Sequence, residues 1–124
     1  MIWEKGIYDI LYAWKMYIKE SKQIGRKLVV IGDGKERKNF RRLVLDLGLS
    51  DTVLTIQNIS NSQIKQLYKH ARAFLLGSTP IRTWQEQFGY TLVDAILQNC
   101  TIVSTTSPAI PEEVGSAGNL VPAS

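Results

Sequence analysis

Two carboxylates stand eight positions apart, on either side of an aromatic–glycine pair, in the stretch W-Q-E-Q-F-G-Y-T-L-V-D-A-I-L-Q-N of residues 84–99. Glu86 precedes the pair, and Asp94 lies in an apolar run that predicts a helix buried nearly all round. A buried carboxylate without polar partners is costly. We therefore expect Asp94 to be buried and to face a pocket, where a ligand or a cation supplies hydrogen bonds.

The aromatic–glycine pair, Phe88 and Gly89, is expected to open this helix. A helix start offers backbone N–H groups and the positive end of the helix dipole, and both suit a phosphate. Carboxylates beside a phosphate site indicate a phosphorylated ligand rich in hydroxyl groups. The alternative is structural: Glu86 would be a surface loop acid, and Asp94 would pair internally with a lysine or arginine. Trp84 would either stack on the ligand or pin the loop.

Other kinds of site are less well supported. The G-D-G turn at residues 32–34 lacks the third glycine of the dinucleotide-binding motif, because Arg37 occupies that position, so a plain strand-to-helix turn is favoured over an NAD site. His70 has no partner at metal-ligand spacing and is expected on the surface. Ser78 has neither a histidine at triad-like spacing nor a nucleophile-elbow motif, so acyl transfer is unsupported.

The elements that would position these residues alternate between strand and helix. Short apolar and β-branched runs predict strands at residues 27–31, 52–56, 73–76 and 101–104. Amphipathic patterns predict helices at residues 6–24 and 35–47, a third that is capped by Ser60 or Asn61, and the buried one within residues 84–99. This order predicts an α/β fold: a doubly wound, Rossmann-like parallel sheet with helices on both faces and right-handed crossovers.

Two loops of this sheet are longer than a connection needs. They span residues 77–87 and 105–110, and each follows the carboxyl end of a predicted strand. Residues 58–61 follow another such end, and the turn at residues 32–34 lies beside it. Open α/β sheets bind ligands at this edge. The sequence therefore predicts a site built from these loops.

The composition fits a single domain over residues 1–124, with 44% hydrophobic and 21% charged residues. The formal net charge is +4, and the basic residues crowd into residues 35–42, which could attract nucleic acid or an anionic membrane. Because Phe40 and Val44 share an apolar stripe with their neighbours, a solvated outer face is the preferred explanation. Cys100 is the single cysteine, which excludes an internal disulfide, and it is expected to be buried. No apolar run approaches the length of a spanning helix.

The segment E-Q-F-G-Y-T-L-V-D-A-I-L-Q-N-C-T-I-V-S-T, residues 86–105, resembles the donor-site signature of the family 4 retaining glycosyltransferases with the GT-B fold. Other pieces are similar to the family's and stand in its order: Lys5-Gly6 at the first helix, V-V-I-G-D-G, A-F-L-L-G-S, and I-P-E-E-V followed by G-N-L-V. The resemblance covers almost the whole chain. It implies the C-terminal, donor-binding half of a GT-B enzyme.

By this resemblance, Glu86 is the catalytic residue and its carboxylate binds hydroxyl groups of the donor sugar. The other donor-binding positions that it implies are Lys5, Ile59, Phe88, Gly89, Tyr90, Thr91 and Asp94. Lys5 and the helix start would bind the diphosphate, Asp94 the ribose, and backbone near Ile59 the base. Asp94 stands where the family usually has glutamate, which shortens its reach by about 1.5 Å and leaves room for a bridging water. No metal and no other cofactor is then required, because lysine and helix start stabilise the leaving diphosphate.

The resemblance also implies a reaction and its partners. A hexose would move from a UDP- or GDP-linked donor to a saccharide or lipid acceptor with retention. An N-terminal acceptor domain, and the first strand of this domain, would precede Met1, so we expect a fragment of a larger enzyme that is truncated at both ends. A cytoplasmic location follows, with any membrane attachment made through that N-terminal domain. The alternatives are a nucleotide-sugar epimerase of the same fold and a non-catalytic nucleotide-sugar-binding module. We expect no nucleic-acid partner.

Overall fold

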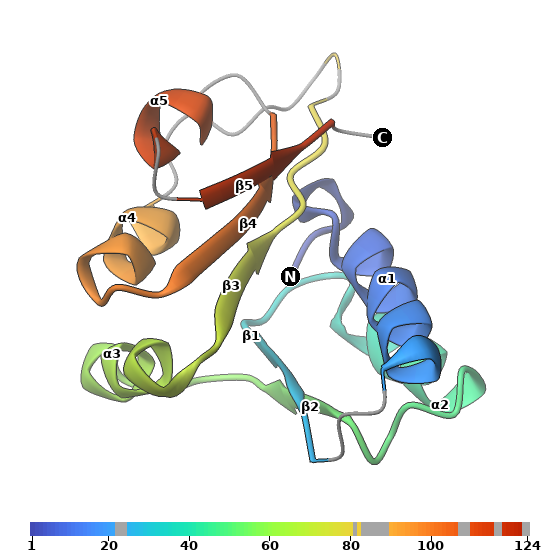
Figure 1. The fold of residues 1–124 in the computed structure, drawn as a ribbon. Helices are drawn as coiled ribbons and strands as arrows, with labels where there is room; N and C mark the ends of the chain where they lie inside the picture. Colours follow the sequence, from blue (N-terminus) through green and yellow to red (C-terminus); the bar gives the residue numbers. More distant parts are fainter. Residues whose placement is uncertain (22–24, 81, 83–89, 107–109, 116–117, 123–124) are drawn as a thin grey trace. The chain divides into compact units, whose positions relative to one another are not determined.

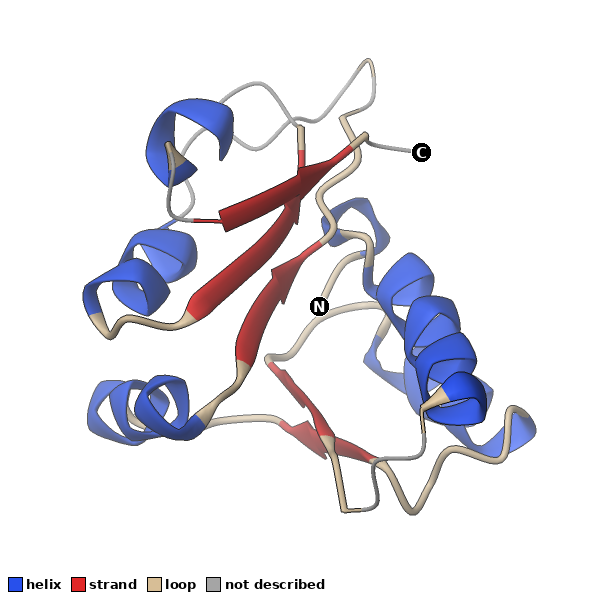
Figure 2. Ribbon diagram, viewed as in Figure 1, coloured by secondary structure: helices blue, strands red, loops and turns tan. Residues whose placement is uncertain are grey.

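The computed structural model describes residues 1–21, 25–80, 82, 90–106, 110–115 and 118–122. The chain divides into two compact units, which hold residues 1–3 with 7–59 and residues 4–6 with 60–124. In both units, helices flank strands that run parallel (Figure 1), and Figure 2 shows how the two kinds of element alternate along the chain. The predicted α/β class with parallel strands is confirmed.

The first unit contains a two-stranded sheet and two helices. Strand β1 (Leu28–Ile31) pairs in parallel with β2 (Val53–Ile56). Helices α1 (Ile7–Glu20) and α2 (Arg37–Asp46) contribute the apolar stripes that the sequence predicts. The buried side chains of this unit are Leu11, Leu28, Phe40, Val44, Leu49 and Val53. Lys38, Arg41 and Arg42 of α2 are exposed, as expected for a solvated face, and Arg37 is half-buried.

A tyrosine–glutamate hydrogen bond joins α1 to the residue that precedes α2. The Tyr8 hydroxyl donates to the Glu36 carboxylate at 2.5 Å, and the Tyr8 ring lies against Phe40 with 6.2 Å between ring centroids. Burial, assisted by the hydrogen bond and the negative charge of Glu36, raises the pKa of Tyr8 to about 12. The same hydrogen bond is the main reason that the pKa of Glu36 is lowered.

We expect Tyr8→Phe to flatten the alkaline limb of the stability curve. Because the folded pKa of Tyr8 lies above its ordinary value of 10.0, the phenol's contribution is complete below pH 10 and is lost as the pH rises toward 12. Wild-type protein should therefore lose more of its free energy of unfolding between pH 9 and pH 11.5 than Tyr8→Phe, as measured by urea unfolding. Tyr12→Phe, at an exposed position of α1, should follow the wild-type curve. Identical losses in all three proteins would contradict the hydrogen bond between Tyr8 and Glu36.

The second unit contains a three-stranded parallel sheet in the order β3 (Ala73–Leu76), β4 (Thr101–Thr105) and β5 (Gly118–Val121). Helices α3 (Asn61–His70), α4 (Tyr90–Leu97) and α5 (Ile110–Val114) lie on the same side of it (Figure 1). Right-handed crossovers between parallel strands put α4 and α5 on one side. The hydrophobic core that they share with the sheet contains Tyr68, Leu76, Leu92, Ala95, Cys100, Ile102, Ile110 and Val114.

Several local predictions hold in this unit. Ser60 caps α3: its Oγ accepts from the backbone N–H of Gln63, whose side chain accepts from the N–H of Ser60, which is a capping box. Cys100 is buried, and burial raises the pKa of its thiol, whereas His70 is exposed. Among the described residues, no helix has the length and apolar character needed to cross a bilayer.

Candidate functional site

Two side-chain hydroxyls fasten the carboxyl end of β3 to β4. Ser104 Oγ donates to the carbonyl of Leu76 at 2.7 Å, and Thr105 Oγ1 donates to the carbonyl of Ser78 at 2.6 Å. The side chains of Ser78, Ser104 and Thr105 are all buried. Buried hydrogen bonds of this kind cost free energy when they are broken, so they fix the backbone where β3 leaves the sheet.

Residues 4–6 are attached to this fixed backbone. The Thr79 N–H donates to the carbonyl of Glu4 at 2.9 Å. Gly6 is buried with a φ of +64°, and a Cβ atom added to it would lie 1.9 Å from the carbonyl oxygen of Gly77. Only glycine fits this contact. Lys5, which ends the short 3₁₀ helix η1 (Trp3–Lys5), is therefore held beside the carboxyl end of β3.

Helix α4 begins at Tyr90, close to the predicted helix start. Tyr90 and Thr91 are both exposed in its first turn. They are the first helical residues of this segment that the structure describes, and an anion is stabilised at the N-terminal end of a helix. The phosphate site stays a prediction, because residues 83–89 lie outside the described residues.

The prediction that Asp94 is buried is wrong. Its side chain is exposed, as is Leu97, so α4 is amphipathic and not apolar all round. At 100° per residue, Leu92, Ala95 and Ile96 fall on one side of the helix and face the core, which leaves Asp94 on the opposite side. Because Asp94 is exposed, the cost of burying a carboxylate no longer indicates that it faces a ligand pocket. Its assignment to the ribose now rests on the family resemblance alone.

The neighbourhood of Asp94 is still defined, because its charge acts on α3. Tyr68 is buried and its ring packs edge-on against Phe74, with 5.6 Å between centroids. Burial raises the pKa of Tyr68, and the negative charge of Asp94 adds to the increase. Asp94 is therefore a solvated carboxylate whose charge acts on the Tyr68 phenol of α3.

The remaining predicted site residues are not brought into this arrangement. Glu86, Phe88 and Gly89, together with Trp84, lie outside the described residues. Ile59 is half-buried at the end of the first unit. Of the predicted site residues, the structure places Lys5 beside the carboxyl end of β3 in the second unit. The catalytic role of Glu86 stays a prediction.

Sequence reasoning missed the positioning hydroxyls. Ser78 was considered only as a nucleophile, whereas its backbone carbonyl accepts the Thr105 hydrogen bond and its side chain is fully buried. The sequence signal for these hydrogen bonds was the presence of serine and threonine at the carboxyl ends of two predicted strands. In the part of the chain that the structure describes, no group of His, Cys, Asp or Glu side chains has the arrangement of a metal site.

The sequence matches the family model described as glycosyl transferases group 1 over residues 1–123. No curated protein sequence matches it significantly.

Several solved structures are similar in fold. The pneumococcal O-GlcNAc transferase GtfA, in complex with UDP and GlcNAc, is 24% identical with a TM-score of 0.80 over 99% of this chain and 23% of its own. The C-terminal domain of a group 1 glycosyl transferase family protein, LpcC from Francisella tularensis, is 24% identical with a TM-score of 0.80. The match covers 98% of this chain and 63% of that domain. Anabaena Alr3699/HepE, in complex with UDP and glucose, is 22% identical with a TM-score of 0.74. The match covers 95% of this chain and 31% of the HepE chain. The chain thus spans between 23% and 63% of the length of the chains in these structures, of which the LpcC chain is a C-terminal domain alone. Their likeness confirms the predicted Rossmann-like fold.

Proposed function

Because the chain belongs to the glycosyl transferases group 1, we propose that it forms the donor-binding domain of a hexosyltransferase. The enzyme transfers a hexose from a nucleotide diphosphate sugar to a saccharide or lipid acceptor, with retention of the anomeric configuration. A further domain of the same enzyme binds the acceptor. Donor binding needs no metal, because protein cations and a helix start neutralise the diphosphate.

The donor that we propose is a UDP-sugar. GtfA and HepE, which share this fold, were crystallised with UDP and GlcNAc and with UDP and glucose. A GDP-sugar is the alternative. Both donors present the same diphosphate, so they would use the same cation and helix start and would differ in the contacts to the base.

The observation that carries this proposal is the attachment of Lys5 to the carboxyl end of β3. The Glu4 carbonyl accepts from Thr79, and Gly6 lies against Gly77, so the lysine between them has a fixed backbone position. Parallel α/β sheets bind ligands at this edge. Each hydrogen bond between an ammonium group and a phosphate oxygen is worth about 1.5–3 kcal/mol.

The other roles complete the donor site that we propose. The N–H groups at the start of α4, at Tyr90 and Thr91, bind the diphosphate with the helix dipole. Asp94 binds the ribose hydroxyls, directly or through water, from its solvated position on α4. Glu86 binds hydroxyl groups of the sugar. As the glycosidic bond breaks, the diphosphate gains negative charge, and Lys5 with the helix start stabilises it more strongly than in the ground state.

Replacing Lys5 with glutamine should weaken donor binding. We expect UDP-glucose or UDP-GlcNAc to bind the wild-type chain in isothermal titration calorimetry, and Lys5→Gln to raise the dissociation constant by about tenfold or more, since charge-assisted hydrogen bonds to the diphosphate are lost. Lys69→Gln is the matched control, because Lys69 is an exposed lysine in the last turn of α3. It should bind as the wild type does.

If Lys5→Gln and Lys69→Gln weaken binding equally, the effect comes from the lost net charge and not from the position of Lys5. If the dissociation constant of Lys5→Gln is unchanged, Lys5 is not part of the donor site. Titration of GDP-mannose in parallel distinguishes the two bases. An epimerase is recognised separately, because it changes the configuration of the bound sugar without any acceptor, whereas the proposed transferase leaves the donor sugar as it is and releases it only to an acceptor.

A further inference from the structure

The net positive charge of the chain comes from its first unit. Residues 1–3 and 7–59 carry ten Lys and Arg against six Asp and Glu, whereas residues 4–6 and 60–124 carry five of each. The formal net charge of +4 therefore belongs to the first unit alone. A net charge concentrated in this way attracts anionic partners over the range of a Debye length.

The cations of α2 surround an exposed leucine. Lys38, Arg41 and Arg42 are all exposed, and Leu45 between them retains 67% of its accessible surface. At 100° per residue these four side chains fall within one third of the helix circumference, opposite the buried Phe40. Asp46 is the acid beside them, and its pairing with Arg42 at 3.9 Å joins two largely exposed side chains, so it neutralises the face only weakly.

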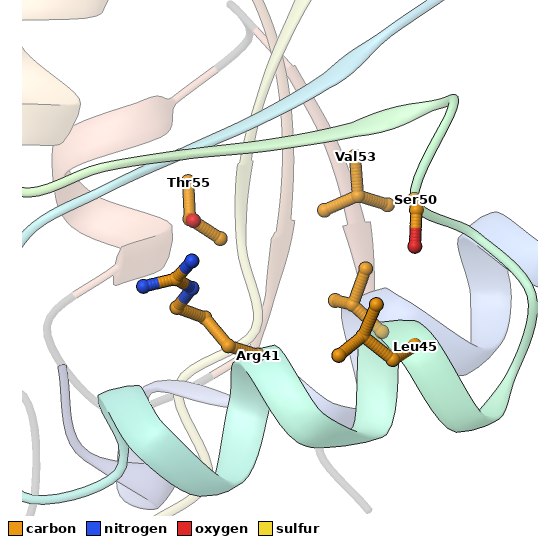
Figure 3. Close-up of a pocket in the computed structure, with 6 residues that line it drawn as sticks. Arg41, Leu45, Ser50, Val53 and Thr55 are labelled. Atoms are coloured by element: carbon orange, nitrogen blue, oxygen red, sulfur yellow. The ribbon is translucent and has the colours of Figure 1, made fainter.

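A shallow hollow continues this face toward β2. It measures about 180 Å³, and its lining residues are Arg41, Val44, Leu45, Ser50, Val53 and Thr55. Figure 3 shows the Arg41 guanidinium extending from α2 toward Thr55, with the apolar side chains of Val53 and Leu45 beside it. The hollow is smaller than the 300–1,000 Å³ of typical small-molecule pockets. It therefore suits a single anionic group or an alkyl segment better than a whole nucleotide sugar.

We propose that this face, formed by Lys38, Arg41, Arg42 and Leu45, docks on an anionic lipid bilayer. Interfacial helices combine cations on their polar face with an apolar side chain that enters the headgroup region. Each lysine or arginine near an anionic surface adds to the attraction, and Leu45 gains by leaving water. A nucleic acid would use the cations alone, because its phosphate backbone offers nothing to an exposed leucine. The face lies in the first unit and stands independently of the donor site.

The proposal is tested by co-sedimentation of the 124-residue chain with vesicles. Binding is expected to vesicles that contain phosphatidylglycerol, to weaken as salt is raised, and to be absent from vesicles of phosphatidylcholine alone. The double variant Arg41→Glu with Arg42→Glu should lose about tenfold or more of the partition coefficient. The control double variant, Lys65→Glu with Lys69→Glu on α3, also brings the formal net charge from +4 to 0, and it should retain binding.

A third variant separates the bilayer from other anions. Leu45→Gln keeps every charge, so it should weaken binding to anionic vesicles several-fold and leave any binding to duplex DNA unchanged. Equal loss in both double variants would overturn the proposal in favour of non-specific charge. Duplex binding as strong as vesicle binding, together with no effect of Leu45→Gln, would overturn it in favour of a nucleic-acid partner. Absence of binding to phosphatidylglycerol vesicles at low salt would also overturn it.

Discussion

Gly6→Ala is expected to destabilise the protein by at least ~3 kcal/mol and to lower its thermal midpoint by roughly 10 °C or more. The new Cβ would lie 1.9 Å from the carbonyl oxygen of Gly77 and 2.5 Å from its carbonyl carbon, so backbone must move on one side of the contact. The positive φ adds about 1–2 kcal/mol of strain for alanine. Since domains are stable by about 5–15 kcal/mol, this loss is a large fraction of the total. Thermal unfolding followed by circular dichroism measures it.

Gly48→Ala is the matched control for this prediction. Gly48 follows α2 and has a φ of +70°, close to the +64° of Gly6, but an added Cβ would meet nothing within 4 Å. It should therefore cost only the strain of about 1–2 kcal/mol. If Gly6→Ala unfolds no earlier than Gly48→Ala, the close contact between Gly6 and Gly77 does not exist, and Lys5 loses its fixed position.

Glu86→Gln is expected to reduce sugar transfer by about a hundredfold or more while nucleotide binding is kept. Glutamine preserves the size of the side chain but lacks the negative charge that would strengthen hydrogen bonds from the donor's hydroxyls in the transition state. The measurement is turnover of a UDP-sugar by the proposed transferase, together with the dissociation constant of UDP.

The control for Glu86→Gln is Glu20→Gln, at the exposed end of α1. It should leave both turnover and UDP binding at the wild-type level. Unchanged turnover in Glu86→Gln would remove this residue from the reaction. Loss of UDP binding along with turnover would make it a donor-binding residue without the catalytic role that the resemblance assigns.

The regular elements were predictable because their patterns are local. The run L-V-V-I and its three counterparts are short and mostly apolar, as strands of a parallel sheet are, and each of the strands β1 to β4 begins within one residue of its prediction. A cap at Ser60 or Asn61 was predictable because both side chains can accept from the first N–H groups of a helix, and the structure shows that Ser60 is the cap. Such signals need no knowledge of the rest of the fold.

Asp94 shows how a local pattern misleads. Its neighbours are apolar on both sides in the sequence, and that density suggested a helix buried all round. Only one side of α4 meets the sheet, so Leu97 remains 71% exposed and Asp94 is solvated as well. Which side of a short helix faces the core depends on the sheet beneath it, and a single sequence does not supply that information.

Strand β5 and helix α5 were not predicted as elements, although the resemblance included their residues. Glycine and asparagine are depleted in strands, and β5 begins with Gly118 and Asn119. Pairing with β4 requires this glycine, because an added Cβ would lie 2.7 Å from the Cβ of Ile102. Both Gly118 and Gly6 are required by contacts with residues far away in the sequence, which a local pattern does not reveal.

The central claim, that the donor's diphosphate binds at the carboxyl end of β3 between Lys5 and the start of α4, is tested most directly by titrating UDP into ¹⁵N-labelled protein. We predict that the largest backbone amide shifts fall at Lys5, Gly6, Tyr90 and Thr91, and that the signals of α2 do not move. Saturation with UDP that leaves these four residues unshifted, or shifts that concentrate on α2, would contradict the claim.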